Sequence, residues 1–225
     1  MGGLHHEYVE GVQAMTDVKY SVMGRADDRL DDLHCSQAFM DGACGLMCVL
    51  QAALVLTGMP RTRIAKLPAV RAGPLLRLWT VAREVYFEGT VEADIVEMVE
   101  AFGPVLQAEP LVSTSVRRIG AAVTKAIRAG HVPMVRFESR VWCHWATVIG
   151  IETLAGETTP RALLTLDPSA SPPWGAFYNA RLELKAKATG LRSDRVFSRP
   201  YRFITGEAWA VRLLGMVVIK RAQPP

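Results

Sequence analysis

One cysteine stands in a setting that favours nucleophilic chemistry. Cys44 lies in the stretch Gly-Ala-Cys-Gly-Leu, and a long apolar run follows it. A cysteine attacks carbonyls as the thiolate, and the start of a helix stabilises that charge through its unpaired N–H groups and macrodipole. Asp41 is a suitable N-cap for a helix that begins here. Cys44 is therefore a candidate nucleophile, and its small neighbours would leave the sulfur approachable.

The partners that such a thiolate needs are also present. His144 opens a predicted strand, where the backbone would hold an imidazole rigidly enough to act as general base. Asp167 ends the next predicted strand, and in an antiparallel hairpin the end of one strand lies beside the start of its neighbour. We therefore expect Asp167 to orient His144. Gln37 precedes Cys44 by seven residues, and its amide could donate to an oxyanion together with the Cys44 N–H.

Zinc binding is a second interpretation of the cysteines and histidines. The adjacent pairs His34-Cys35 and Cys143-His144 would together supply N and S ligands. However, neighbouring residues on a strand point to opposite faces, and structural zinc sites usually space their ligands by about two to four residues. We therefore expect no metal and no cofactor. Buried packing is the simpler interpretation of Cys48, one turn after Cys44.

Two tryptophans adjoin the candidate histidine, and three further histidines lie elsewhere in the sequence. Trp142 and Trp145 flank His144 and could shield it from water, line a substrate groove or simply pack against the sheet. The three remaining histidines, which are expected to be structural or surface residues, are His5, His6 and His131.

The elements that must position these residues follow from the hydrophobic pattern. The apolar run over 43–56 is broken by Gln51 and stops at Gly58-Met59-Pro60, which predicts a helix buried on nearly every side. Helical periodicity continues in three stretches, 75–81, 91–102 and 116–129. After Gly130 the pattern changes to short β-branched runs, at 132–138, 145–152, 162–166, 180–184, 201–205 and 216–220.

The order of these elements predicts the fold class and the domain limits. Strands that follow one another without intervening helices usually pair antiparallel, so we expect an α+β fold with the central Cys44 helix packed on an antiparallel β-sheet. Residues 1–33 carry many charges and weak periodicity, which is typical of an N-terminal arm or irregular lead-in. A single domain is expected to span 34–225.

Composition narrows the class of protein. The chain has 225 residues, half of them apolar, and a formal charge of +4, which excludes a wholly disordered chain. Basic residues concentrate in 181–225 and acidic ones in 1–60, but they are dispersed, so we expect a solvated surface and no nucleic-acid partner. The longest apolar run is shorter than the ~20 residues that span a bilayer.

Cellular location is inferred from the cysteines and the chain start. The four cysteines form no CxxC pair, and the sequence does not start with a basic, apolar and small-residue leader. We therefore expect a cytoplasmic protein without a membrane span. Export by a route that uses no N-terminal signal stays open.

With these motifs the sequence resembles the papain-like cysteine peptidases, and among them the bacteriocin-processing peptidase domains that recognise a double-glycine leader. The resemblance covers roughly residues 34–220 in element order. It rests on Gln37 upstream of Cys44, on the strand His-Trp-Ala-Thr-Val-Ile-Gly from His144, and on Leu-Asp-Pro around Asp167. It implies a papain-like fold, with Cys44 as nucleophile, His144 as general base and acid, Asp167 as its orienter and Gln37 in the oxyanion hole.

The functional expectation is a cysteine peptidase. Such a hydrolase would cleave a peptide or isopeptide bond of a protein or peptide substrate through a thioester acyl-enzyme. Two alternatives stay open: transfer of the acyl group to an amine, as in transglutaminase-like enzymes, and a catalytically silent module that binds a peptide or a ubiquitin-like tail. Candidate substrates are leader peptides, ubiquitin-like proteins, host proteins and the chain itself.

Overall fold

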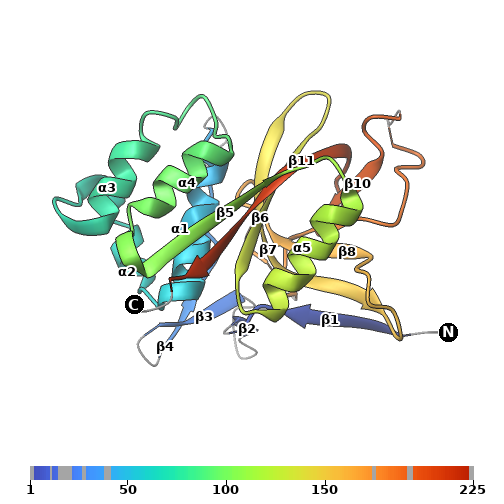
Figure 1. Ribbon diagram of the computed structural model, residues 1–225, viewed down its shortest axis with the longest axis horizontal. Helices are drawn as coiled ribbons and strands as arrows, with labels where there is room; N and C mark the ends of the chain where they lie inside the picture. The colour runs from blue at the N-terminus through green and yellow to red at the C-terminus, as the bar shows by residue number, and fades with distance from the viewer. Residues whose placement is uncertain are drawn as a thin grey trace.

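The computed structural model describes residues 3–10, 12–14, 22–26, 29–37, 42–173, 176–191 and 195–222. Helices α1 to α4 lie together on one side of the strands, and α5 lies on the other side (Figure 1). The α-helices are α1 (Cys44–Thr57), α2 (Arg61–Ile64), α3 (Gly73–Ala82), α4 (Glu92–Glu100) and α5 (Val116–Arg128), with 3₁₀ turns η1 (Leu67–Ala69) and η2 (Gly103–Val105). The strands are β1 (Leu4–Tyr8), β2 (Val12–Ala14), β3 (Val22–Ala26), β4 (Arg29–Asp32), β5 (Leu106–Val112), β6 (Val132–Glu138), β7 (Cys143–Leu154), β8 (Ala162–Leu166), β9 (Ala180–Glu183), β10 (Arg199–Phe203) and β11 (Ala208–Arg221).

Six of the described strands form a closed antiparallel barrel. Their order is β6–β11–β10–β9–β8–β7, and the pairing of β7 with β6 closes the ring. The two longest strands, β7 and β11, also pair with strands outside this barrel. β1 pairs with residues 150–154 of β7, and β5 pairs with residues 215–221 of β11. The barrel therefore carries two extra strands, one on each long strand.

This barrel corrects the expected papain-like α+β fold, in which the Cys44 helix packs on an antiparallel sheet. The register shifts between Val148 and Gly150 on β7, and between Leu213 and Gly215 on β11. Such bulges bend a strand and increase its twist, which helps a sheet to close on itself. Hydrophobic periodicity predicts that strands exist, but it carries no information on whether the first and last strands pair. The fold prediction was wrong at that step.

The lead-in predicted over residues 1–33 contains regular strands. β1 pairs antiparallel with β7, from Leu4 opposite Leu154 to Tyr8 opposite Gly150. Val9 is buried in the core, and β2, β3 and β4 form a separate three-stranded sheet. The prediction of an irregular arm was therefore wrong for these segments. The hydrophobic pattern does not indicate β1, because its first three residues are exposed and it shows little hydrophobic alternation.

Helix α1 is the buried helix that the apolar run predicts. It packs against β6, β7 and β11, and it ends at Gly58, whose φ of 65° suits glycine. Gln51 is fully buried. In the orientation that satisfies its amide, Gln51 donates to Leu166 O (3.3 Å) and to Thr147 Oγ1 (2.5 Å). The polar residue in the apolar run thus fastens the helix to the barrel.

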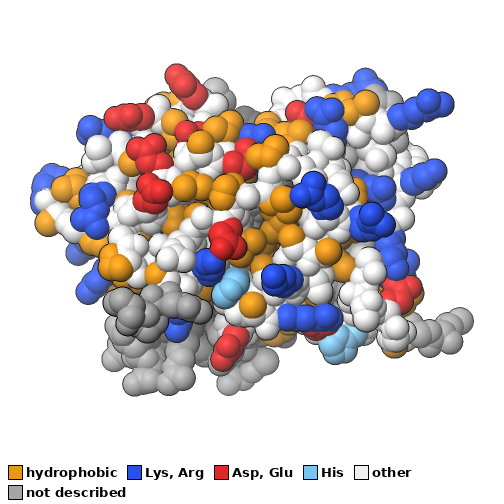
Figure 2. Space-filling view, in the orientation of Figure 1, with side chains coloured by type: hydrophobic (Ala, Val, Ile, Leu, Met, Phe, Trp, Pro, Cys, Tyr) orange, Lys and Arg blue, Asp and Glu red, His pale blue; other side chains and the backbone are white. Residues whose placement is uncertain are grey.

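The surface charge is unevenly distributed on the face seen in Figure 2. Lys and Arg side chains are numerous over the part that holds α5 and β10, whereas Asp and Glu gather over α3 and α4. Among the described residues, no helix combines the length and apolar character that crossing a membrane requires.

Candidate active site

His144 and Asp167 meet, as the strand pattern predicts. His144 is the second residue of β7, and Asp167 directly follows β8. These strands pair antiparallel with Thr147 opposite Leu166, so the start of β7 lies near the end of β8. His144 Nε2 lies 2.9 Å from Asp167 Oδ1, and both side chains are buried.

Two further residues hold the Asp167 carboxylate. Ser169 donates twice to Oδ1, from its N–H at 2.7 Å and from its hydroxyl at 2.6 Å. The Tyr201 hydroxyl donates to Oδ2 at 2.5 Å. Hydrogen bonds to the charged form favour ionisation, so these donors offset the burial of the carboxylate. Neither Ser169 nor Tyr201 was among the residues predicted for the site. The Asp-Pro-Ser turn could have pointed to Ser169, whereas Tyr201 lies on a distant strand and gave no signal.

The attraction between His144 and Asp167 outweighs the effect of burial on their pKa values. Burial lowers the pKa of His144, but the charge and hydrogen bond of Asp167, together with the neighbouring Cys44, raise it from 6.5 to about 10. Burial raises the pKa of Asp167, whereas His144, Ser169 and Tyr201 together bring it below its usual value. The pair is therefore an imidazolium and a carboxylate at neutral pH.

The backbone of Asp167 is held from two other segments. Asn179 accepts from Asp167 N at 2.7 Å and donates to Asp167 O at 2.9 Å. His34 Nε2 lies 2.9 Å from the same carbonyl oxygen. Burial lowers the pKa of His34, which favours a neutral ring that donates this bond. His34 and Asn179 thus fix the peptide that carries Asp167, a role that no motif indicated.

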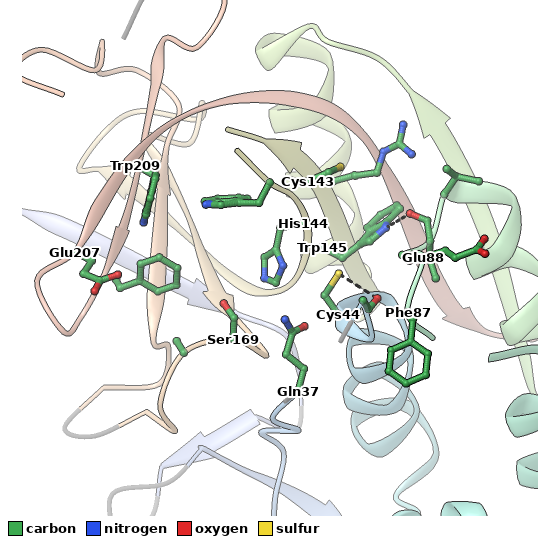
Figure 3. Close-up of a pocket in the computed structure, with 18 of the residues that line it drawn as sticks. Gln37, Cys44, Phe87, Glu88, Cys143, His144, Trp145, Ser169, Glu207 and Trp209 are labelled. Carbon is green, nitrogen blue, oxygen red and sulfur yellow. Dashed lines mark hydrogen bonds between the residues drawn. The ribbon is translucent and has the colours of Figure 1, made fainter. Parts of the chain in front are cut away.

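Cys44 begins α1, although the helix cap differs from the expected one. Ala43 is the N-cap, and Asp41 lies outside the described residues. Met47 N makes the first helical hydrogen bond, to Ala43 O at 2.9 Å, so the Cys44 N–H precedes the helical ladder. The Cys44 side chain reaches the His144 ring, and its sulfur lies 3.9 Å from Gly42 O. Figure 3 shows the sulfur beside the His144 ring.

The small residues around Cys44 have a packing reason. A Cβ on Gly42 would lie 2.6 Å from Gly89 N, and one on Gly45 would lie 2.0 Å from Thr90 Oγ1. Gly42 also donates its N–H to Tyr86 O at 2.8 Å. The glycines therefore allow residues 86–90 to lie against the helix start. That these small residues also leave the sulfur approachable by a substrate backbone stays a prediction.

Gln37 lines the same cavity. Its N–H donates to Pro168 O at 2.9 Å, which ties the segment before α1 to the residue after Asp167. Its side-chain Oε1 is buried and has no hydrogen-bond partner in the described part of the chain. Figure 3 shows the amide between Ser169 and Cys44. Rotation about its last torsion would exchange oxygen and NH₂, so the amide can present a donor there.

These groups open onto a cavity of about 1120 Å³. One wall is formed by residues 87–91, where Phe87 is 79% exposed. The turn between β10 and β11 forms the opposite wall, with Trp209 37% exposed. Cys44 and His144 lie between these walls (Figure 3), whereas Asp167 is enclosed behind His144.

The two tryptophans beside His144 have different environments. Trp145 is buried and donates from Nε1 to Thr90 O at 2.9 Å, so it supports the cavity wall from inside. The Trp142 ring lines the cavity, and its centroid lies 5.8 Å from that of His144 with the planes at 81°. Trp142 therefore limits the access of water to His144.

Two other cysteines, Cys48 and Cys143, differ from Cys44 in their surroundings. Cys48 is fully buried, and burial raises its pKa well above the usual value. Cys143 is exposed, yet partial burial of its thiol also raises its pKa. Within the described ranges, no three His, Cys, Asp or Glu side chains are grouped so that they could hold a metal ion.

Comparison with known proteins adds no assignment. No protein-family model matches the sequence, and no curated protein does either. The resemblance to papain-like and bacteriocin-processing peptidases therefore has no support beyond its few motif residues, and the barrel disagrees with the fold that it implies. The candidate site consequently rests on geometry and chemistry.

Proposed function

We propose that this protein is a cysteine hydrolase that cleaves a peptide or isopeptide bond. Cys44 is the nucleophile, His144 the general base and acid, and Asp167 the residue that orients His144. The observation that carries the proposal is the buried His144–Asp167 ion pair, with the cysteine at the start of α1 beside His144 in an open cavity. Buried charges are costly, and such perturbed groups concentrate at functional sites.

The first half of the reaction forms a thioester. The Cys44 thiolate, with the His144 imidazolium beside it, attacks the substrate carbonyl carbon and drives its π electrons onto the oxygen. The Cys44 N–H and the Gln37 amide donate to that oxyanion. The carbonyl re-forms as the C–N bond breaks, and the departing amine takes the proton of His144.

The second half restores the enzyme. Neutral His144 takes a proton from water as the water oxygen attacks the thioester carbon. The C–S bond then breaks, the carboxylic acid product leaves, and the thiolate is regenerated beside the imidazolium. Asp167 holds the ring orientation throughout and stabilises its positive charge.

A peptide is the substrate class that the cavity supports. A volume of about 1120 Å³ exceeds that of most small-molecule pockets, which hold roughly 300–1,000 Å³. Exposed aromatic side chains stand on both rims, Phe87 on one and Trp209 on the other. Such groups supply contact area to an extended chain.

Peptide-library cleavage tests this proposal. The protein is incubated with a proteome-derived peptide mixture, and mass spectrometry identifies new chain ends. We expect cleavage by the wild type and by Cys143→Ala, a matched control in the same cavity, and none by Cys44→Ala. Products joined to an added amine would instead favour acyl transfer. Peptide binding without any new product would favour the silent binding module and overturn the proposal.

A further inference from the structure

The β10–β11 hairpin presents a set of side chains to the candidate site that the mechanism does not use. Tyr201 lies opposite Trp209, and Phe203 N donates to Glu207 O at 2.9 Å across the turn. Directly opposed residues share one face of a hairpin, and so do residues two apart. The face that carries Tyr201 toward Asp167 therefore also carries Phe203, Glu207 and Trp209 toward the cavity.

Aromatic rings dominate this part of the cavity. The centroid of Trp209 lies 5.7 Å from that of Trp142 with the planes at 72°, and Trp142 in turn adjoins His144. Phe203 lines the same wall. Trp209 is more than one-third exposed, so its surface is open to a ligand. The rings form a wall that leads outward from His144.

A carboxylate completes the wall. Glu207 is exposed and lines the cavity. Within the described ranges it forms no ion pair. Arg136 is the basic side chain of the described cavity lining, and it is engaged by Glu92 at 3.1 Å. Figure 3 shows Glu207 and Trp209 on one side of His144, with Phe87 and Glu88 on the other. This end of the cavity is therefore acidic, although the whole chain is basic.

From this arrangement we infer a cation subsite formed by Trp142, Phe203, Trp209 and Glu207, which takes an arginine or lysine side chain of the peptide substrate. Aromatic faces attract a cation through their quadrupole, and a carboxylate adds direct charge complementarity. The long apolar stem of Arg or Lys would lie along the rings while its charged end reaches Glu207. The inference rests on the proposed function for its substrate, because the subsite lies beside the proposed nucleophile.

A binding measurement tests the subsite without requiring catalysis. Acetylated alanine-based hexapeptides, with arginine scanned through each position, are titrated against the Cys44→Ala protein and followed by intrinsic tryptophan fluorescence. Each peptide has a counterpart with citrulline, which keeps the shape of arginine but lacks its charge. At one position we expect arginine to bind about tenfold more tightly than citrulline.

Two matched variants locate the preference. Glu207→Gln removes the charge at an exposed turn position and should abolish the difference between arginine and citrulline. Glu88→Gln removes the carboxylate at the other side of the cavity and should preserve it. Equal binding of both peptides to the parent protein, or loss of the preference in Glu88→Gln alone, would overturn the inference.

Alkylation keeps the two proposals separable. A chloromethyl ketone peptide that labels Cys44 reports on the nucleophile, whereas the titrations use a protein that has no nucleophile. Arginine-selective binding without Cys44 labelling would support the subsite and count against the hydrolase. Labelling of Cys44 without arginine-selective binding would support the hydrolase and count against the subsite.

Discussion

Tyr201 donates a 2.5 Å hydrogen bond to Asp167 Oδ2, the carboxylate oxygen that His144 does not use. The ring and the carboxylate are both fully buried. Burial and the negative charge of Asp167 raise the pKa of Tyr201 well above 10. The phenol therefore stays protonated and keeps its hydrogen bond to the carboxylate. A strand distant in sequence thus helps to determine the charge state of the candidate site.

Replacing Tyr201 with Phe should therefore destabilise the ionised Asp167 carboxylate. Loss of a hydrogen bond to a charged group costs about 1.5–3 kcal/mol, and we expect that decrease in the free energy of unfolding, measured by urea denaturation. The imidazole pKa of His144 should rise, because the carboxylate loses a donor that competes with the imidazolium, and NMR titration would detect the change. Tyr178→Phe is the control on a half-buried ring. An unchanged His144 titration would contradict the role given to Tyr201.

Cys44 should be the cysteine that reacts fastest with iodoacetamide at about pH 6. The Cys44 sulfur lies in the cavity beside His144, whereas burial raises the pKa values of Cys48 and Cys143. Peptide mapping after a short exposure measures the four rates. His144→Gln should slow the labelling of Cys44 and leave that of Cys143 unchanged. Rapid labelling of Cys143 with inert Cys44 would refute the assigned nucleophile.

The stability of the protein should decrease at alkaline pH because of His144. Folding raises the pKa of this group from 6.5 to about 10, so its contribution is complete below pH 6.5 and is lost as the pH rises toward 10. Urea denaturation across that range should show a decline in the wild type that is absent from His144→Gln. His131→Gln, outside the site, should retain the decline. The same slope in all three proteins would show that other groups cause it.

Gly45→Ala should destabilise the protein, although Ala normally favours a helix by about 1 kcal/mol over Gly. The new Cβ would lie 2.0 Å from Thr90 Oγ1, so residue 90 must move, at a cost of about 1–3 kcal/mol. Gly120→Ala in α5 is the matched control, because its Cβ would lie 3.1 Å from the flexible end of Leu184 and 3.6 Å, an ordinary van der Waals distance, from Pro160 Cγ. Thermal unfolding compares them, and a higher Tm for Gly45→Ala would disprove the close approach.

Gln37→Ala should reduce turnover of a cleaved peptide by about 2.7–4 kcal/mol of transition-state stabilisation if its amide donates to the oxyanion. The measurement is kcat and KM separately, on a substrate from the library screen. The Cys143→Ala protein should keep wild-type values. A rise in KM at constant kcat would assign Gln37 to substrate binding alone.

Local pattern in the sequence was sufficient for many elements. The residue ranges predicted for β6 and β8 agree with those observed, and α1 ends at the predicted Gly58. Helix and strand periodicities arise from side chains a few residues apart, and stop signals act on one or two residues. The contact between His144 and Asp167 was also predictable, because adjacent strands joined in sequence usually pair antiparallel.

Tertiary structure alone decided the closure of the barrel and the surroundings of the site. The β7–β8 pairing shifts register between Val148 and Gly150, and the β6–β11 pairing shifts between Leu213 and Gly215. The alternation of apolar residues does not predict these shifts. Tyr201 reaches Asp167 from β10 and Asn179 reaches it from the residue before β9, and the glycines beside Cys44 are explained by residues 86–90. Such contacts join segments far apart in the chain, so they are determined by the packing of the whole fold rather than by any local run of residues.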